Sequence, residues 1–83
     1  MRTEIAAIVE DVEAFHRLMD TLVAIRKERG ISRTEVSKRM GSMRVLAIES
    51  ENSDPHVGEL QAYARAIGCR VYFEIDEEPD SEV

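Results

Sequence analysis

The chain has 83 residues, a net charge of −6 and one cysteine, Cys69. A length of this order suits one domain with a single hydrophobic core. No run of about 18 apolar residues occurs, and the N-terminus lacks the basic and apolar regions of a secretion signal, so we expect a cytoplasmic protein without a membrane span. The lone cysteine excludes an internal disulfide, and no Cys/His spacing typical of a zinc site is present.

The charges are distributed unevenly along the chain. Residues 24–47 carry seven basic and two acidic side chains, a net charge of +5, whereas the remainder carries four basic and fifteen acidic ones, a net charge of −11. A basic middle within an acidic chain is expected if one face binds phosphate while the others repel it. An ordinary solvated helix surface would have a similar composition, so the motifs must decide between the two.

The first predicted element is one long helix, or two in succession, that ends at Gly30. Its apolar residues recur at the three- and four-residue spacing of one helical face: Ile5, Ile8, Val9, Val12, Phe15, Met19, Leu22 and Ile25. This stripe is longer than one helix of a small bundle needs. Residues 1–17 are therefore predicted to be a helical extension that pairs with a second copy or folds back on the domain, residues 18–68.

A capping box at residues 32–35, Ser-Arg-Thr-Glu, predicts the start of the next helix. Gly41 supplies the sharp turn after it. Ser42 is expected to cap a third helix in which Val45 and Ile48 face the core. The residues left facing outward are Ser42, Met43, Arg44 and Ala47.

One more helix is predicted after the loop at residues 52–55, on the apolar face formed by Leu60, Tyr63, Ala64 and Ile67. The period then changes from helical to alternating, which predicts a strand over residues 69–76 with Val71, Phe73 and Ile75 on one side. No second strand is found in the chain, so the expected partner is the same segment of a second copy across a two-fold axis. Residues 77–83 are predicted to be an acidic disordered tail.

Several of these motifs follow one another in a fixed order. Arg26 precedes Gly30-Ile31-Ser32-Arg33-Thr34-Glu35-Val36-Ser37 and Gly41, and Ile48-Glu49, Asp54-Pro55 and the run from Leu60 to Gly68 come after them. In this order and spacing they resemble the Cro and phage-repressor helix-turn-helix family, often called the XRE family. The resemblance implies a mainly α, lambda-repressor-like bundle, here of about five helices with one C-terminal dimerisation strand.

The resemblance also implies roles for individual residues. Arg26 and Glu49 correspond to an ion pair that ties the first helix to the recognition helix and fixes its geometry. Arg33 stands beside the DNA backbone, where a fixed charge suits a phosphate. The expected DNA-binding residues are Arg33, Thr34, Lys38, Arg39, Ser42, Met43, Arg44 and Ala47. At the base-reading positions, only Arg44 can make a strong bidentate contact with a base.

The connection between Gly41 and Glu49 is two residues shorter than is usual in the family. Each residue adds about 100° of helical turn, so the recognition helix is expected to be rotated or retracted. This difference, together with the few base readers, favours a protein partner over DNA.

We therefore keep two functions open. The first is a sequence-specific transcriptional regulator, a phage repressor, a Cro-like protein or an autoregulating antitoxin, that binds a palindromic operator in double-stranded DNA as a homodimer. The second is a protein-interaction module, such as an antitoxin that neutralises a toxin partner with weak or no DNA binding. An enzyme is the least favoured class, since His16 and His56 have no neighbours at catalytic spacing, and we expect no catalytic residue, metal or cofactor.

Overall fold

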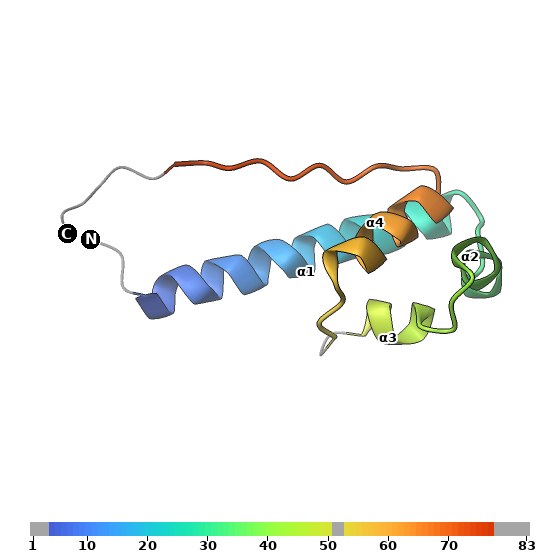
Figure 1. Cartoon of the computed structure of the whole chain (residues 1–83), viewed down its shortest axis with the longest axis horizontal. Helices are drawn as coiled ribbons and strands as arrows, with labels where there is room; N and C mark the ends of the chain where they lie inside the picture. Colours follow the sequence, from blue (N-terminus) through green and yellow to red (C-terminus); the bar gives the residue numbers. More distant parts are fainter. Residues whose placement is uncertain (1–3, 51–52, 78–83) are drawn as a thin grey trace.

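The computed structural model describes residues 4–50 and 53–77, and this part of the chain contains four α-helices (Figure 1). They are α1 (Glu4–Glu28), α2 (Arg33–Met40), α3 (Val45–Glu49) and α4 (Val57–Ala66). The three short helices gather around the C-terminal half of α1, whose N-terminal half projects beyond them. None of these helices combines the length and the apolar character that a membrane span needs.

The core lies where the four helices meet. Its buried apolar residues are Met19, Leu22, Val36, Val45, Ile48, Leu60, Tyr63, Ala64, Ala66 and Ile67. The predicted inward orientation of Val45 and Ile48 is confirmed, because both are almost completely buried. Each aliphatic side chain buried in this way contributes about 1.5–3 kcal/mol, so even the very short α3 is held firmly by two of its residues.

A glycine with a left-handed backbone follows α1, α2 and α4, and the predicted stop at Gly30 and turn at Gly41 are confirmed. The φ angles of Gly30, Gly41 and Gly68 are 68°, 65° and 83°. Residues with a Cβ avoid this region, so glycine is the residue that ends a helix here at the least cost.

The third helix begins later than predicted, at Val45 instead of directly after Ser42. The amide of Ser42 donates to the carbonyl of Ser37 at 3.1 Å and so completes the end of α2. The Ser42 hydroxyl accepts from the amide of Arg44 at 3.1 Å, within the turn. Because Ser42 belongs to the end of α2, the short connection leaves only five residues, Val45–Glu49, for α3.

The predicted count of about five helices and the predicted C-terminal strand are both wrong for the described residues. One helix, α1, runs unbroken for 25 residues, so the N-terminal stripe gives one helix and the total is four. Residues 69–77 form no strand and run back in the direction of the N-terminal end of α1 as an extended segment, which we call the arm (Figure 1). A strand exists only where a second strand pairs with it, and the described part of this chain offers none. Apart from Glu77, the predicted tail lies outside the described residues.

Candidate nucleic-acid interface

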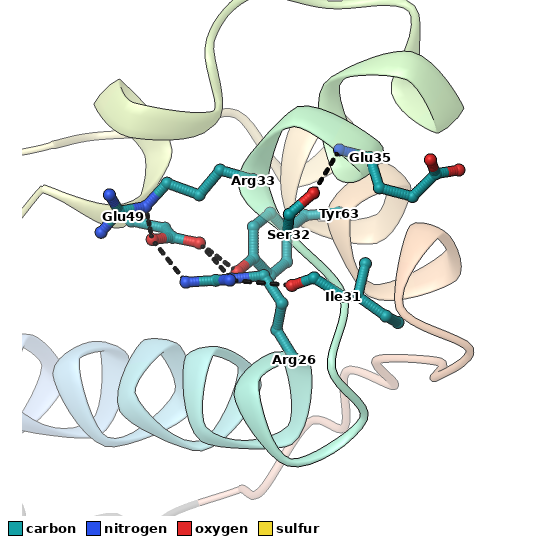
Figure 2. Close-up of polar contacts among 7 residues, drawn as sticks. All are labelled: Arg26, Ile31, Ser32, Arg33, Glu35, Glu49 and Tyr63. Atoms are coloured by element: carbon teal, nitrogen blue, oxygen red, sulfur yellow. Dashed lines mark hydrogen bonds and ion pairs between the residues drawn. The ribbon is translucent and has the colours of Figure 1, made fainter.

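A buried ion pair joins α1 to α3 (Figure 2). Arg26 Nε donates to Glu49 Oε2 at 2.9 Å, and the two side chains are only 8% and 5% exposed. Arg26 Nη1 also donates to the carbonyl of Ile31 at 2.9 Å, and the Tyr63 hydroxyl donates to Glu49. Arg26 and Glu49, which the resemblance predicts to form a pair, are thus in contact, and the hydrogen bond from Tyr63 links the pair to α4.

The charges of this pair are stabilised from several sides. Burial favours the neutral acid, yet hydrogen bonds from Tyr63 and Arg33 and the charge of Arg26 hold the pKa of Glu49 below its ordinary value. Burial, and then the hydrogen bond to Glu49, raises the pKa of Tyr63 above its ordinary value. At neutral pH the site therefore holds an ionised glutamate and a neutral tyrosine. Removing one partner of such a pair costs about 3–5 kcal/mol, because the other charge is left buried and unpaired.

Arg33, expected beside the DNA backbone, also binds Glu49. Its Nε lies 2.9 Å from Glu49 Oε1, and about half of its side chain remains exposed. Arg33 and Glu49 line a shallow hollow together with residues of α1 that include Lys27. A phosphate that bound Arg33 here would compete with Glu49 for the guanidinium group.

Four of the predicted DNA-binding residues meet at the turn between α2 and α3. They line one open, mainly apolar depression, the α2–α3 hollow, which is formed by Thr34, Ser37, Lys38, Gly41, Ser42 and Met43. Met43 is 94% exposed, and Lys38 is largely exposed with its Nζ 4.0 Å from Glu35 Oε1. Ala47 is also exposed, on α3. Lys38 thus brings a weakly paired positive charge to the edge of this hollow.

The two remaining predicted arginines reach other neighbours. Arg39 Nη1 donates to the carbonyl of Ala66 at 2.7 Å, and its Nε donates to Glu35 Oε2 at 3.0 Å. Arg44 donates through Nε and Nη2 to both carboxylate oxygens of Glu59. Each predicted arginine is therefore held by closer contacts within the protein than Lys38, whose ion pair with Glu35 is 4.0 Å long.

Sequence reasoning missed two residues that shape this surface. Glu59 accepts from Arg44 and from the amide of His56, and these hydrogen bonds lower its pKa. A glutamate three residues after a helix start is a capping signal, but nothing in the sequence indicates its contact with Arg44. Arg29 Nη1 donates to the carbonyls of Ile67 and Gly68 at 2.6 and 3.1 Å, a favourable position for a cation at the C-terminus of α4.

Comparisons with known proteins agree with this geometry. A family model described as Helix-turn-helix matches residues 22–73. Over 65 residues the chain is 46% identical to "Antitoxin HigA1" from two strains of Mycobacterium tuberculosis, a match that covers 76% of this chain and 44% of the relative. The chain thus spans less than half the length of these curated relatives, and no solved structure gives a significant match. On the family match and the motifs that it covers, the chain belongs to the XRE-type helix-turn-helix family.

Proposed function

We propose that this chain is a sequence-specific DNA-binding regulator of the antitoxin type, which binds a palindromic operator as a homodimer and represses its own operon. The observation that carries the proposal is the α2–α3 hollow, which lies open to solvent beside an α3 held in place by Arg26 and Glu49. The antitoxin part of the proposal rests on the 46% identity to the mycobacterial antitoxin. Such a regulator acts in the cytoplasm, and the proposal gives the chain no catalytic role.

In this proposal the predicted residues divide into two groups. Lys38, Arg33 and Arg39 contact phosphates with Thr34 beside them, because exposed cations on α2 suit the DNA backbone. Ser42, Met43, Arg44 and Ala47 face the groove. Since α3 has only five residues and Arg44, just before it, is the one strong base reader, much of the specificity is expected to come from DNA shape.

The homodimer is proposed to form through the arm. Val71 packs against the core, whereas Phe73 and Ile75, which the alternating pattern predicts to share its side, are exposed. Pairing with the arm of a second copy would satisfy its backbone amides and cover these side chains. Two heads joined in this way would reach successive major grooves about 34 Å apart, which requires a palindromic operator.

A protein-interaction module with weak DNA binding is the second candidate. The five-residue α3 and the engagement of Arg44 by Glu59 favour it, because both reduce direct contact with bases. In this case the toxin partner, and not the operator, would be the main ligand.

Fluorescence anisotropy with the DNA upstream of the protein's own gene distinguishes the two candidates. A regulator binds this DNA more tightly than a random duplex, and its affinity falls with salt with a slope near −0.9 per phosphate neutralised. Absence of salt-sensitive binding to either duplex at about 10 µM protein, where even non-specific binding is usually visible, would contradict the regulator and support the interaction module.

A further inference from the structure

The outer half of α1, residues 4–17, carries an apolar stripe that nothing in the described chain covers. Ile5, Ile8, Val9 and Val12 are 75%, 55%, 51% and 47% exposed and recur at the spacing of one helical face. This half of the helix extends beyond the bundle formed by the other helices (Figure 1).

The stripe continues the face that α1 uses in the core. Phe15 packs against the core, and Met19 and Leu22, further along the same face, are buried in it. The outer half therefore has the apolar pattern of a core helix, but no other described element packs against that face. Contiguous exposed apolar groups are unfavourable in water and mark interaction sites, and an isolated helix of this length is only marginally stable.

The charges beside the stripe indicate what covers it. Residues 4–20 contain five acidic side chains and one basic one, a net charge of −4: Glu4, Glu10, Asp11, Glu13, Asp20 and Arg17. This is opposite in sign to the +5 of residues 24–47, so the outer half repels DNA and anionic lipid surfaces. A second copy of α1 laid along it would bring like charges together, which is unfavourable.

We propose that the outer half of α1 is the docking surface for a basic, amphipathic segment of a partner protein. The apolar residues of that segment cover Ile5, Ile8, Val9 and Val12, and its lysines or arginines meet the acidic side chains on either side of the stripe. The inference rests on the proposed antitoxin function, because it assigns the protein partner to α1 and leaves the α2–α3 hollow free for DNA.

A pair of labelled helical peptides tests the proposal on the full chain. The first carries leucines at the spacing of one helical face with lysines beside them, and the second has glutamates in place of the lysines. We expect the lysine peptide to bind at least tenfold more tightly, with amide chemical-shift changes in ¹⁵N-labelled protein confined to residues 4–20. Equal affinities, or shifts that map to another part of the chain, would overturn the proposal.

Two double variants separate charge from position. Asp11→Lys with Glu13→Lys is expected to reverse the preference between the peptides. Glu28→Lys with Asp54→Lys makes the same change in net charge away from the stripe. This control is expected to keep the wild-type preference for the lysine peptide. Both pairs are exposed, so circular dichroism should show an unchanged helical content.

A third double variant separates this inference from the proposed DNA binding. Ile8→Asn with Val12→Asn should lose the lysine peptide while operator affinity stays within twofold of the wild type. If the wild type does not bind the operator, the proposed regulator function is contradicted, but the proposed docking surface is not. If this variant instead turns a wild-type dimer into a monomer in sedimentation experiments, the stripe is covered by a second copy and the inference is wrong.

Discussion

Arg44 and Glu59 form an ion pair that ties the residue before α3 to the first turn of α4. Arg44 Nη2 lies 3.3 Å from Glu59 Oε1, and Arg44 Nε donates to the other carboxylate oxygen. An exposed pair of this kind contributes little to stability because water screens it, whereas a bidentate contact with guanine is stronger. DNA can therefore recruit Arg44 from Glu59, at a small cost in affinity.

Glu59→Gln is expected to raise operator affinity by up to about fivefold, the equivalent of a surface ion pair. Glutamine still offers an oxygen to the amide of His56, so the start of α4 should be retained. Anisotropy titrations measure the effect, and Glu28→Gln, at an exposed position of α1, is the control for the same change in charge. Unchanged or weaker binding would show that Glu59 does not restrain Arg44.

Arg44→Ala is expected to weaken binding to the operator by about 1–3 kcal/mol and to relax the preference at one base position, which we predict to be a guanine. Lys38→Ala should instead weaken all sequences alike and reduce the salt slope by about 1, because Lys38 contacts phosphate. Titrations of both variants with operator and random duplexes measure this difference. If Arg44→Ala lowers the affinity for both duplexes equally, Arg44 contacts a phosphate and not a base.

Tyr63→Phe is expected to make the protein more sensitive to acid. The pKa of Glu49 is lowered in the folded state, so its ionisation contributes stability above the unfolded-state pKa of about 4.3, and this contribution is lost as the pH falls through the folded-state pKa. Losing the Tyr63 hydrogen bond raises the folded-state pKa and moves the acid transition to higher pH. We also expect a loss of about 1.5–3 kcal/mol at pH 7, as for a hydrogen bond to a charged group.

Urea denaturation followed by circular dichroism between pH 3 and pH 7 measures the change in Tyr63→Phe. Tyr72→Phe removes the same hydroxyl from the exposed arm and should leave the free energy of unfolding unchanged at every pH. If both variants show the same pH dependence as the wild type, Tyr63 does not control the pKa of Glu49.

Gly68→Ala is expected to destabilise the fold more than Gly30→Ala. Both glycines have a left-handed backbone, which costs about 1–2 kcal/mol for a residue with a Cβ. A Cβ at Gly68 would also lie 2.7 Å from Arg29 Nη1, whereas nothing lies within 4 Å of one at Gly30. Arg29 would have to move and loosen its bonds to the end of α4, which adds about 1 kcal/mol. Thermal denaturation of the two variants tests this order.

Phe73→Asp is expected to convert the dimer to a monomer with loss of operator binding, because it places a charge in the apolar seam between two arms. Sedimentation velocity of the wild type and the variant at tens of micromolar protein measures the change. A monomeric wild type, or a variant that remains fully dimeric, would show that the arm is not the interface.

The sequence by itself determined where α1, α2 and α4 end. The glycines at 30, 41 and 68 end helices because only glycine adopts a left-handed backbone at little cost, and this property is local. The three- and four-residue spacing of apolar residues likewise placed Val45 and Ile48 in the core. The order of motifs was enough to identify the helix-turn-helix family.

Only the tertiary structure decided which groups the basic residues contact and where α3 begins. Arg33 and Arg44 bind glutamates 16 and 15 residues away, and such pairs depend on how the helices pack and not on local spacing. The start of α3 depends on whether Ser42 caps α3 or completes the end of α2, and in the structure its amide bonds to Ser37 at the end of α2. The arm likewise forms no strand within the described chain, because pairing requires a second backbone that no alternating pattern can supply.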